Sequence, residues 1–216
     1  MERAAFLVTD SNRQAVALID GVADWQVPVQ WIYGPSGAGK SHLAAVLAHQ
    51  CDALTLNATD LDGAAVTALL AGEADYDALI IDGLDALPAD CEEILFHLLN
   101  YARHENKKTL LLSQAAAGRL TVSLPDLASR LKAIAAIALK SPDDTLMRGL
   151  LLKLFGDRQL NVEPRVIDYL LPRMERDYAD MVTLVRRIDR QALSEKRAIT
   201  VPMVAEILES HISETE

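Results

Sequence analysis

The chain has 216 residues, of which 50% are hydrophobic and 24% are charged. This composition excludes a disordered protein and fits one large α/β domain, or a medium domain with a small helical partner. The formal net charge of −10 disfavours strong direct DNA binding, because proteins that hold nucleic acid alone usually present a basic surface.

No stretch of the sequence approaches the ~20 apolar residues that a membrane-spanning helix needs, and no signal peptide is visible at the N-terminus. A cytoplasmic protein without a membrane partner is therefore expected. The two cysteines, Cys51 and Cys91, are far apart and have no metal-type spacing. Both are expected to be reduced thiols.

Five short apolar runs predict the strands of a sheet. They are Val29–Tyr33, Ala53–Leu56, Ala78–Ile81, Thr109–Leu112 and Ala135–Leu139. Continuous Leu, Ile, Val and Ala without polar alternation is typical of strands buried on both faces. Helical patterns lie between them, near Ser41–Gln50, Thr59–Ala71 and Pro88–His104. This alternation predicts a parallel sheet with right-handed crossovers.

The sequence changes character near residue 140. Ser141 and Pro142, followed by two aspartates, suit the N-cap and first turn of a helix. Three further helices are predicted near Pro164–Glu175, Ala179–Lys196 and Pro202–His211, with no strand-like run among them. We therefore expect an α/β nucleotide-binding domain at 1–140 and an all-helical domain at 141–216.

A phosphate loop of the pattern G-x-x-x-x-G-K-[ST] follows the first predicted strand and opens a predicted helix. Its residues are Gly34, Pro35, Ser36, Gly37, Ala38, Gly39, Lys40 and Ser41. The glycines let the loop turn its N–H groups toward phosphate oxygens, and the helix adds its positive dipole end. Lys40 would reach the β- and γ-phosphates and Ser41 would help to hold Mg²⁺. His42, directly after the loop, is expected to pack or cap rather than to catalyse.

A nucleotide-binding sheet of this kind needs a carboxylate at a strand end facing the loop, to orient Mg²⁺ or its waters. Asp82 closes the third predicted strand and supplies it; the alternative is a solvated turn residue. ATPases of this layout commonly carry a second acid next, which polarises the attacking water, but Gly83 occupies that position here. Asp85 would substitute only if the turn redirected it. Nucleotide binding is therefore better supported than hydrolysis.

Together these features resemble the DnaA branch of the AAA+ ATPases, and within it the regulatory members that lack a DNA-binding domain. The matching segments are Phe6–Val8, Ser11–Asn12, Gly39–Leu43, Leu79–Asp82, Leu110–Ser113, Leu124–Leu131, Ala198–Pro202 and Ala205–Leu208. The block LPDLASRL at 124–131 makes the match narrow, whereas the phosphate loop is shared by many families. The resemblance implies a P-loop AAA+ core, with a five-stranded parallel sheet and flanking helices, followed by a small helical lid.

The resemblance also implies roles for single residues. Arg130 would be the arginine finger, presented to the nucleotide of a neighbouring subunit, since a guanidinium stays charged and bonds two phosphate oxygens at once. Ser113 would be the polar sensor below the γ-phosphate, and Phe6, Val8 and Asn12 would lie against the adenine. Without the resemblance, Arg130 is most simply a solvated arginine and Ser113 a turn former.

Two departures from the family pattern concern the lid and the N-terminus. The family places a lid arginine against the bound nucleotide, but Ala179 occupies that position and Arg176 lies one turn earlier. Regulatory members of this branch also carry a short N-terminal sliding-clamp motif, a Gln with spaced Leu, Pro and Phe residues. None is visible in this sequence, which leaves a sliding clamp open as a partner.

The resulting hypothesis is a regulator of DNA replication initiation that binds ADP or ATP with Mg²⁺ and turns it over weakly or not at all. It would supply Arg130 in trans to ATP bound by a DnaA-like initiator. One alternative is a self-assembling AAA+ loader or motor, a homo-oligomer, against which Gly83 argues. Others are an adaptor that tethers the initiator, and a small-molecule kinase, disfavoured because the helical domain follows the sheet.

Overall fold

The computed structural model describes residues 7–61, 66–67, 69 and 76–212. These residues form two compact units. One consists of Asn12–Lys140, and the other of Leu7–Ser11 together with the residues from Ser141 onward. We call them the core unit and the lid unit. In the part of the chain that the structure describes, no helix is both long and apolar enough to cross a bilayer.

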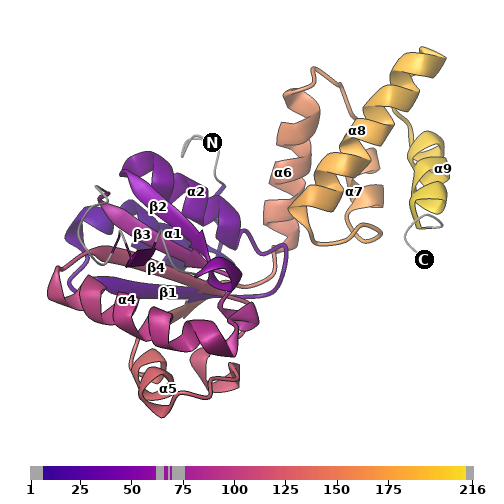
Figure 1. Ribbon diagram of the computed structural model, residues 1–216. Helices are drawn as coiled ribbons and strands as arrows, with labels where there is room; N and C mark the ends of the chain where they lie inside the picture. Colours follow the sequence, from indigo (N-terminus) through magenta and orange to yellow (C-terminus); the bar gives the residue numbers. More distant parts are fainter. Residues whose placement is uncertain (1–6, 62–65, 68, 70–75, 213–216) are drawn as a thin grey trace. The chain divides into compact units, whose positions relative to one another are not determined.

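A five-stranded sheet forms the centre of the core unit (Figure 1). Its strands are β1 (Val29–Tyr33), β2 (Ala53–Asn57), β3 (Ala78–Asp82), β4 (Lys108–Ser113) and β5 (Ala136–Ala138). They are ordered β2-β3-β4-β1-β5, and every pairing is parallel. The predicted five-stranded parallel sheet is thus confirmed, with strand ends that differ by at most one residue. The carboxyl ends of the strands share one edge, where β1 leads into the phosphate loop.

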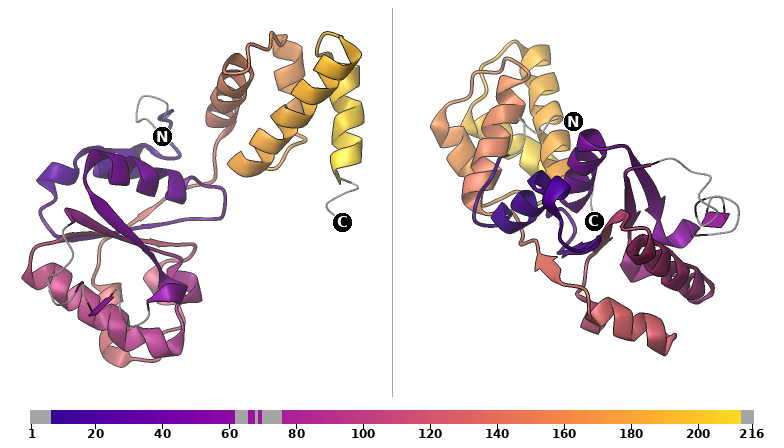
Figure 2. Two further views of the ribbon diagram at one scale, coloured as in Figure 1. Left: turned by 45° about the horizontal axis from the view of Figure 1, so that its top comes forward. Right: turned by 90° about the vertical axis from the view of Figure 1, so that its left-hand side faces the viewer.

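Helices cover both faces of the sheet, as Figure 2 shows. They are α1 (Arg13–Asp20) and α2 (Lys40–Gln50) on one face, and α4 (Glu92–His104) and α5 (Pro125–Lys132) on the other. Successive residues of a strand point to opposite faces, so Trp31 packs toward α4 and α5 while Ile32 packs toward α1 and α2. Both side chains are fully buried.

Two predicted helices of the core unit differ from what the structure describes. The pattern near Thr59–Ala71 falls largely on residues outside the described part; within it the structure describes the short 3₁₀ turn Ala58–Asp60 and helical positions at 66, 67 and 69. The pattern at Pro88–His104 begins with a 3₁₀ turn, Ala89–Cys91, before α4 starts at Glu92. Cys91 and Cys51 are free thiols.

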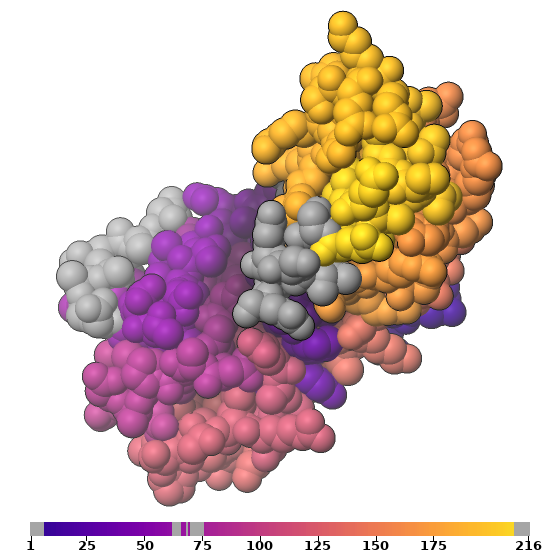
Figure 3. Space-filling model, turned by 90° about the vertical axis from the view of Figure 1, so that its right-hand side faces the viewer, coloured from indigo at the N-terminus to yellow at the C-terminus, as the bar shows by residue number. Residues whose placement is uncertain are grey.

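The lid unit contains a hydrophobic core of its own. Its described helices are α6 (Asp144–Gly156), α7 (Pro164–Leu170), α8 (Tyr178–Glu195) and α9 (Val201–Ile212). Met147 and Leu151 of α6 pack with Leu184 and Ile188 of α8 in this core. The C-terminal helices α8 and α9 lie against each other, gold and yellow in Figure 3.

The start of α6 differs from the prediction. Asp143, and not Ser141, is the N-cap, because its carboxylate accepts a hydrogen bond from the Leu146 N–H at 2.7 Å. That bond, with further bonds from Thr9 and Ser11, holds the pKa of Asp143 below its usual value. More than one residue at the start of α6 is of a type that can cap a helix, and the contacts in the folded lid unit determine which one does so.

The end of α7 also differs from the prediction. The helix ends at Leu170 rather than near Glu175. Pro172 explains the early end, because it offers no N–H to continue the hydrogen bonds of the helix. The chain then re-enters helix at α8, where Asp177 caps the first turn through the Ala179 N–H at 2.7 Å.

Candidate nucleotide-binding site

The phosphate loop connects β1 to α2 at the carboxyl edge of the sheet. A Cβ atom on Gly34 would lie 2.2 Å from the carbonyl oxygen of Leu139, so only glycine fits where the loop leaves β1 beside β5. Gly39 directly precedes α2 with φ 100°, a left-handed conformation that favours glycine. The loop therefore delivers the chain into the N-terminus of α2, where free N–H groups and the helix dipole attract anions.

Lys40 is folded over its own loop. Its Nζ donates to the carbonyl oxygens of Gly34 at 2.6 Å and of Pro35 at 2.8 Å. Partial burial lowers the pKa of Lys40 below its ordinary value, while the nearby carboxylates of Asp82 and Asp85 act in the opposite direction. The ammonium group is thus placed at the loop before any phosphate is bound.

Ser41 and Asp82 lie together at this edge. The Ser41 hydroxyl donates to Asp82 Oδ2 at 3.3 Å, which joins the first turn of α2 to the end of β3. A hydroxyl and a carboxylate are hard oxygen ligands of the kind that Mg²⁺ takes together with waters and nucleotide phosphates. Among the described residues no group of three or more His, Cys, Asp or Glu side chains could hold a metal alone. The pair fits a Mg²⁺ ion that depends on a nucleotide for its other ligands.

The two residues considered for activating water after Asp82 have other roles. Gly83 has φ 78°, a left-handed conformation that strains any residue with a side chain. The Asp85 carboxylate accepts hydrogen bonds from the backbone N–H of Gln114 and, at 2.9 Å, of Ala115. Asp85 therefore fixes the backbone that follows β4.

Ser113 is buried, and its hydroxyl is fully used. It accepts a hydrogen bond from Trp31 Nε1 at 2.8 Å and donates its proton to the carbonyl oxygen of Ala115 at 2.6 Å. A serine hydroxyl has one proton to donate. In this conformation the group offers no donor to a phosphate, and the sensor role stays a prediction.

The residues expected near the adenine are described in part. Val8 is 47% exposed and belongs to the lid unit, whereas Asn12 is buried at the N-cap position of α1 in the core unit. Phe6 lies outside the described residues. His42 is partly buried in the first turn of α2. The adenine site therefore stays a prediction.

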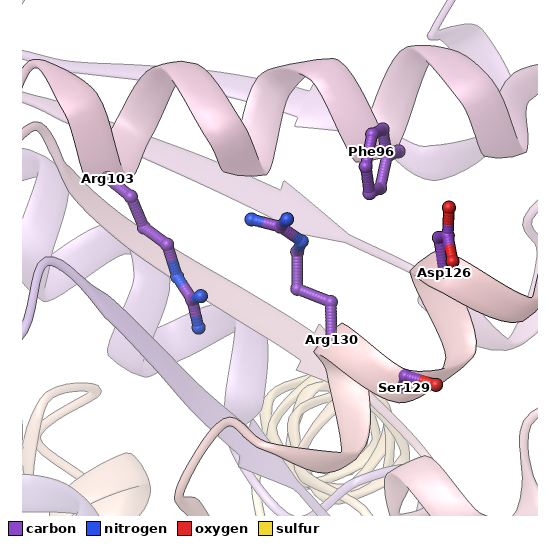
Figure 4. Close-up of a pocket in the computed structure, with 5 residues that line it drawn as sticks. All are labelled: Phe96, Arg103, Asp126, Ser129 and Arg130. Atoms are coloured by element: carbon purple, nitrogen blue, oxygen red, sulfur yellow. The ribbon is translucent and has the colours of Figure 1, made fainter.

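Arg130 lines a pocket of about 360 Å³ between α4 and α5 (Figure 4). Its guanidinium carbon lies 4.8 Å from the centre of the Phe96 ring, within the range of a cation–π interaction. The other lining residues are Arg103, Asp126 and Ser129. No sequence motif marks Phe96 or Arg103. Their one signal is a seven-residue spacing, which places both on the same face of α4.

The lid unit holds the two residues compared with the family's lid arginine. Ala179 lies in the first turn of α8. Arg176, just before that helix, donates to the carbonyl oxygen of Pro142 at 2.7 Å and to the carboxylate of Asp144. Arg176 thus ties the start of α6 to the turn before α8.

Comparison with known proteins agrees with this geometry. Residues 147–208, which span α6 to α9, match the family model of the Hda lid domain. A structure of the replication initiator DnaA bound to AMPPCP and single-stranded DNA superposes with a TM-score of 0.73 at 20% identity, covering 89% of this chain and 67% of that one. Domain III of Thermotoga maritima DnaA gives a TM-score of 0.77 at 16% identity, covering 95% and 94%.

A DNA motor protein has the same fold. The Thermotoga maritima RuvB branch migration motor superposes with a TM-score of 0.73 at 18% identity, covering 93% of this chain and 68% of that one. The chain spans 63% to 67% of the longer DnaA structures. These likenesses establish the fold, because they are accompanied by little sequence identity.

The parallel sheet, the phosphate loop and the following helical lid define a P-loop AAA+ fold. Residues 147–208 form a lid of the Hda type. The fold expected from the sequence is thereby confirmed, and the match of the lid supports the expected DnaA-like family.

Proposed function

We propose that this protein binds ADP or ATP at its phosphate loop and acts on a DnaA-type replication initiator. In a mixed assembly it presents Arg130 to ATP held by the adjacent initiator and promotes hydrolysis of that ATP. The observation that carries the proposal is the position of Arg130, which lies over Phe96 in an open pocket of the core unit. The Hda-type lid and the DnaA-like fold support the choice of partner.

Nucleotide binding rests on the chemistry of the loop. The N–H groups at the start of α2 are suited to bind a phosphate, and Lys40 supplies a cation already held by Gly34 and Pro35. Two DnaA structures with this fold were obtained with AMPPCP, a nucleotide analogue. Ser41 and Asp82 would hold a Mg²⁺ ion, which neutralises phosphate charge when it is bound.

Slow turnover of the protein's own nucleotide follows from the residues after Asp82. Gly83 carries no acid to polarise water, and the Asp85 carboxylate is occupied by backbone N–H groups. The bound nucleotide then serves as a structural ligand that stabilises the folded state. This arrangement favours a regulator over a self-assembling motor.

The proposal is tested by replacing Arg130. The variants Arg130→Ala and Arg130→Lys are mixed with an initiator carrying radiolabelled ATP, and phosphate release is followed in a single turnover. An arginine supplied in trans is worth about 10³- to 10⁵-fold in rate, so Arg130→Ala should abolish stimulation. ADP affinity, measured with a fluorescent analogue, should stay unchanged. Lys132→Ala, on the exposed side of the same helix, is the matched control.

Normal stimulation by Arg130→Ala would overturn the finger assignment. Rapid phosphate release by the isolated protein, rising steeply with its own concentration, would instead support a self-assembling ATPase.

A further inference from the structure

The pocket beside Arg130 contains a second guanidinium that the proposed function does not use. In Figure 4 the side chain of Arg103 points from α4 toward α5, and that of Arg130 points from α5 toward α4. Both enter the same pocket of about 360 Å³. The surfaces of α4 and α5 adjoin, magenta and pink in Figure 3, and Arg103 is exposed. A ligand from solution can therefore reach both groups.

Among the described residues, no acid neutralises either guanidinium. The side chains of Arg103 and Arg130 take part in no ion pair or hydrogen bond there. Asp126 lines the pocket as well, but on the side of Phe96, away from Arg103 (Figure 4). Arg103 lies about 10 Å along α4 from Phe96 at 1.5 Å per residue. Two like charges facing one pocket repel each other, and an anion bound between them would relieve that repulsion.

The chemistry of two guanidinium forks points to phosphate. Each fork forms paired hydrogen bonds with a carboxylate or a phosphate. One carboxylate has two oxygens and satisfies one fork, whereas the terminal phosphates of a nucleotide offer oxygens to both. The polyphosphate tail of a nucleoside triphosphate is therefore the ligand class that matches the pair.

The topology places this pocket away from the protein's own phosphate loop. Because α4 connects two parallel strands, β3 and β4, it runs antiparallel to them. It starts near the carboxyl edge of the sheet, where the loop lies, and Arg103 falls in its last turn. At 1.5 Å per residue, Arg103 is about 16 Å along the axis from Glu92. The phosphates that reach the pocket must come from another molecule.

We propose that Arg103 and Arg130 together bind the phosphate groups of a nucleotide carried by the neighbouring subunit. This inference rests on the proposed function and adds Arg103 to it as a second phosphate-binding residue. Arg130 is held over the Phe96 ring and Arg103 approaches from the opposite side, so the tail is bound between two cations. A variant at Arg103 should therefore weaken both phosphate binding and stimulation.

The first experiment measures phosphate binding by the pocket in the isolated protein. The protein is saturated with ADP, which fills the phosphate loop, and inorganic tripolyphosphate is titrated by calorimetry. Arg103→Ala and Arg130→Ala should each weaken this binding about 10-fold or more, as expected for the loss of charge-assisted hydrogen bonds. Arg119→Ala, at an exposed arginine elsewhere in the core unit, should bind as the unmodified protein does.

The second experiment follows initiator-bound ATP in single turnover, as a function of the concentration of this protein. Arg103→Ala should lower the maximal rate about 10-fold, and Arg103→Lys should recover part of it, because a lysine keeps the charge but loses the fork. Unchanged tripolyphosphate binding and an unchanged maximal rate in Arg103→Ala would overturn the inference while leaving Arg130 as the finger.

Two further outcomes are distinguishable. A higher half-saturating concentration with an unchanged maximal rate would mean that Arg103 contacts an acidic group of the partner, which also contradicts the inference. If Arg103→Ala and Arg130→Ala both stimulated the initiator normally, the proposed function itself would be contradicted.

Discussion

Replacing Glu92 provides a direct test of how α4 is held against α5. It is 4% exposed, and its carboxylate accepts hydrogen bonds from two backbone N–H groups. The Ser123 N–H lies 2.9 and 3.0 Å from the two carboxylate oxygens, and the Leu124 N–H lies 2.7 Å from Oε2. Leu124 is the N-cap of α5 and has no capping side chain. Glu92 therefore holds the two residues that precede α5 from another helix.

Replacing Glu92 by alanine leaves two partly buried N–H groups without an acceptor. Hydrogen bonds to charged groups contribute about 1.5 to 3 kcal/mol each. Because both bonds share one carboxylate, we expect a loss of about 3 kcal/mol, equivalent to a fall in Tm of roughly 6 to 12 °C for a chain of this size. Glu92→Gln keeps one carbonyl acceptor, and we expect about half of that loss.

The assay combines urea denaturation with hydrogen exchange of the segment 120–132. Exchange should rise in this segment more than elsewhere in the core unit, and stimulation of the initiator should fall with it, because α5 carries Arg130. Glu93→Ala is the matched control, since the neighbouring Glu93 side chain is 81% exposed. Stability of Glu92→Ala within about 0.5 kcal/mol of the unmodified protein, the usual range for surface changes, would refute the reasoning.

Two other changes have defined outcomes. Lys40→Ala should weaken ADP binding about 10- to 100-fold, the value of one or two charge-assisted hydrogen bonds, and a fluorescent-nucleotide titration would detect it; unchanged affinity would remove the phosphate loop from the account. Asp143→Ala should cost the lid unit about 1 kcal/mol as a lost N-cap. Because folding lowers the pKa of Asp143, its contribution is present above about pH 4 and is lost as the pH falls through the lowered value. Asp143→Asn should keep the cap and lose that acid dependence in urea titrations.

The sequence predicted best what local pattern alone determines. Each strand is a continuous apolar run, and the phosphate loop carries its own glycines, so the sheet, the loop and the start of α2 follow from neighbouring residues. Asp143, the N-cap of α6, bonds the nearby Leu146 N–H and also Thr9 and Ser11, more than a hundred positions earlier in the chain. Contacts between such distant residues cannot be predicted from a local sequence pattern.

Contacts between residues distant in sequence also explain why the surroundings of Ser113 and the pocket beside Arg130 could not be predicted. The resemblance assigned Ser113 as a phosphate sensor, which stays a prediction, and the sequence did not predict that its hydroxyl bonds Trp31, a residue 82 positions away. Arg103 carried no motif, and its significance appears only when α4 and α5 are packed together around Arg130. The proposed function thus depends on pairs of elements that the sequence predicts singly.

The acids at the end of β3 and after it have two different roles, one at the phosphate loop and one in holding the backbone before α5. Asp82 stays at the phosphate loop, beside Ser41. Asp85 holds the backbone just after β4, and Glu92 holds the backbone just before α5. The connection between β4 and α5 is therefore fixed at both ends by carboxylates from one stretch of chain. A AAA+ protein that hydrolyses its own nucleotide needs an acid near the γ-phosphate; here the acids beyond Asp82 instead set the helix from which Arg130 extends.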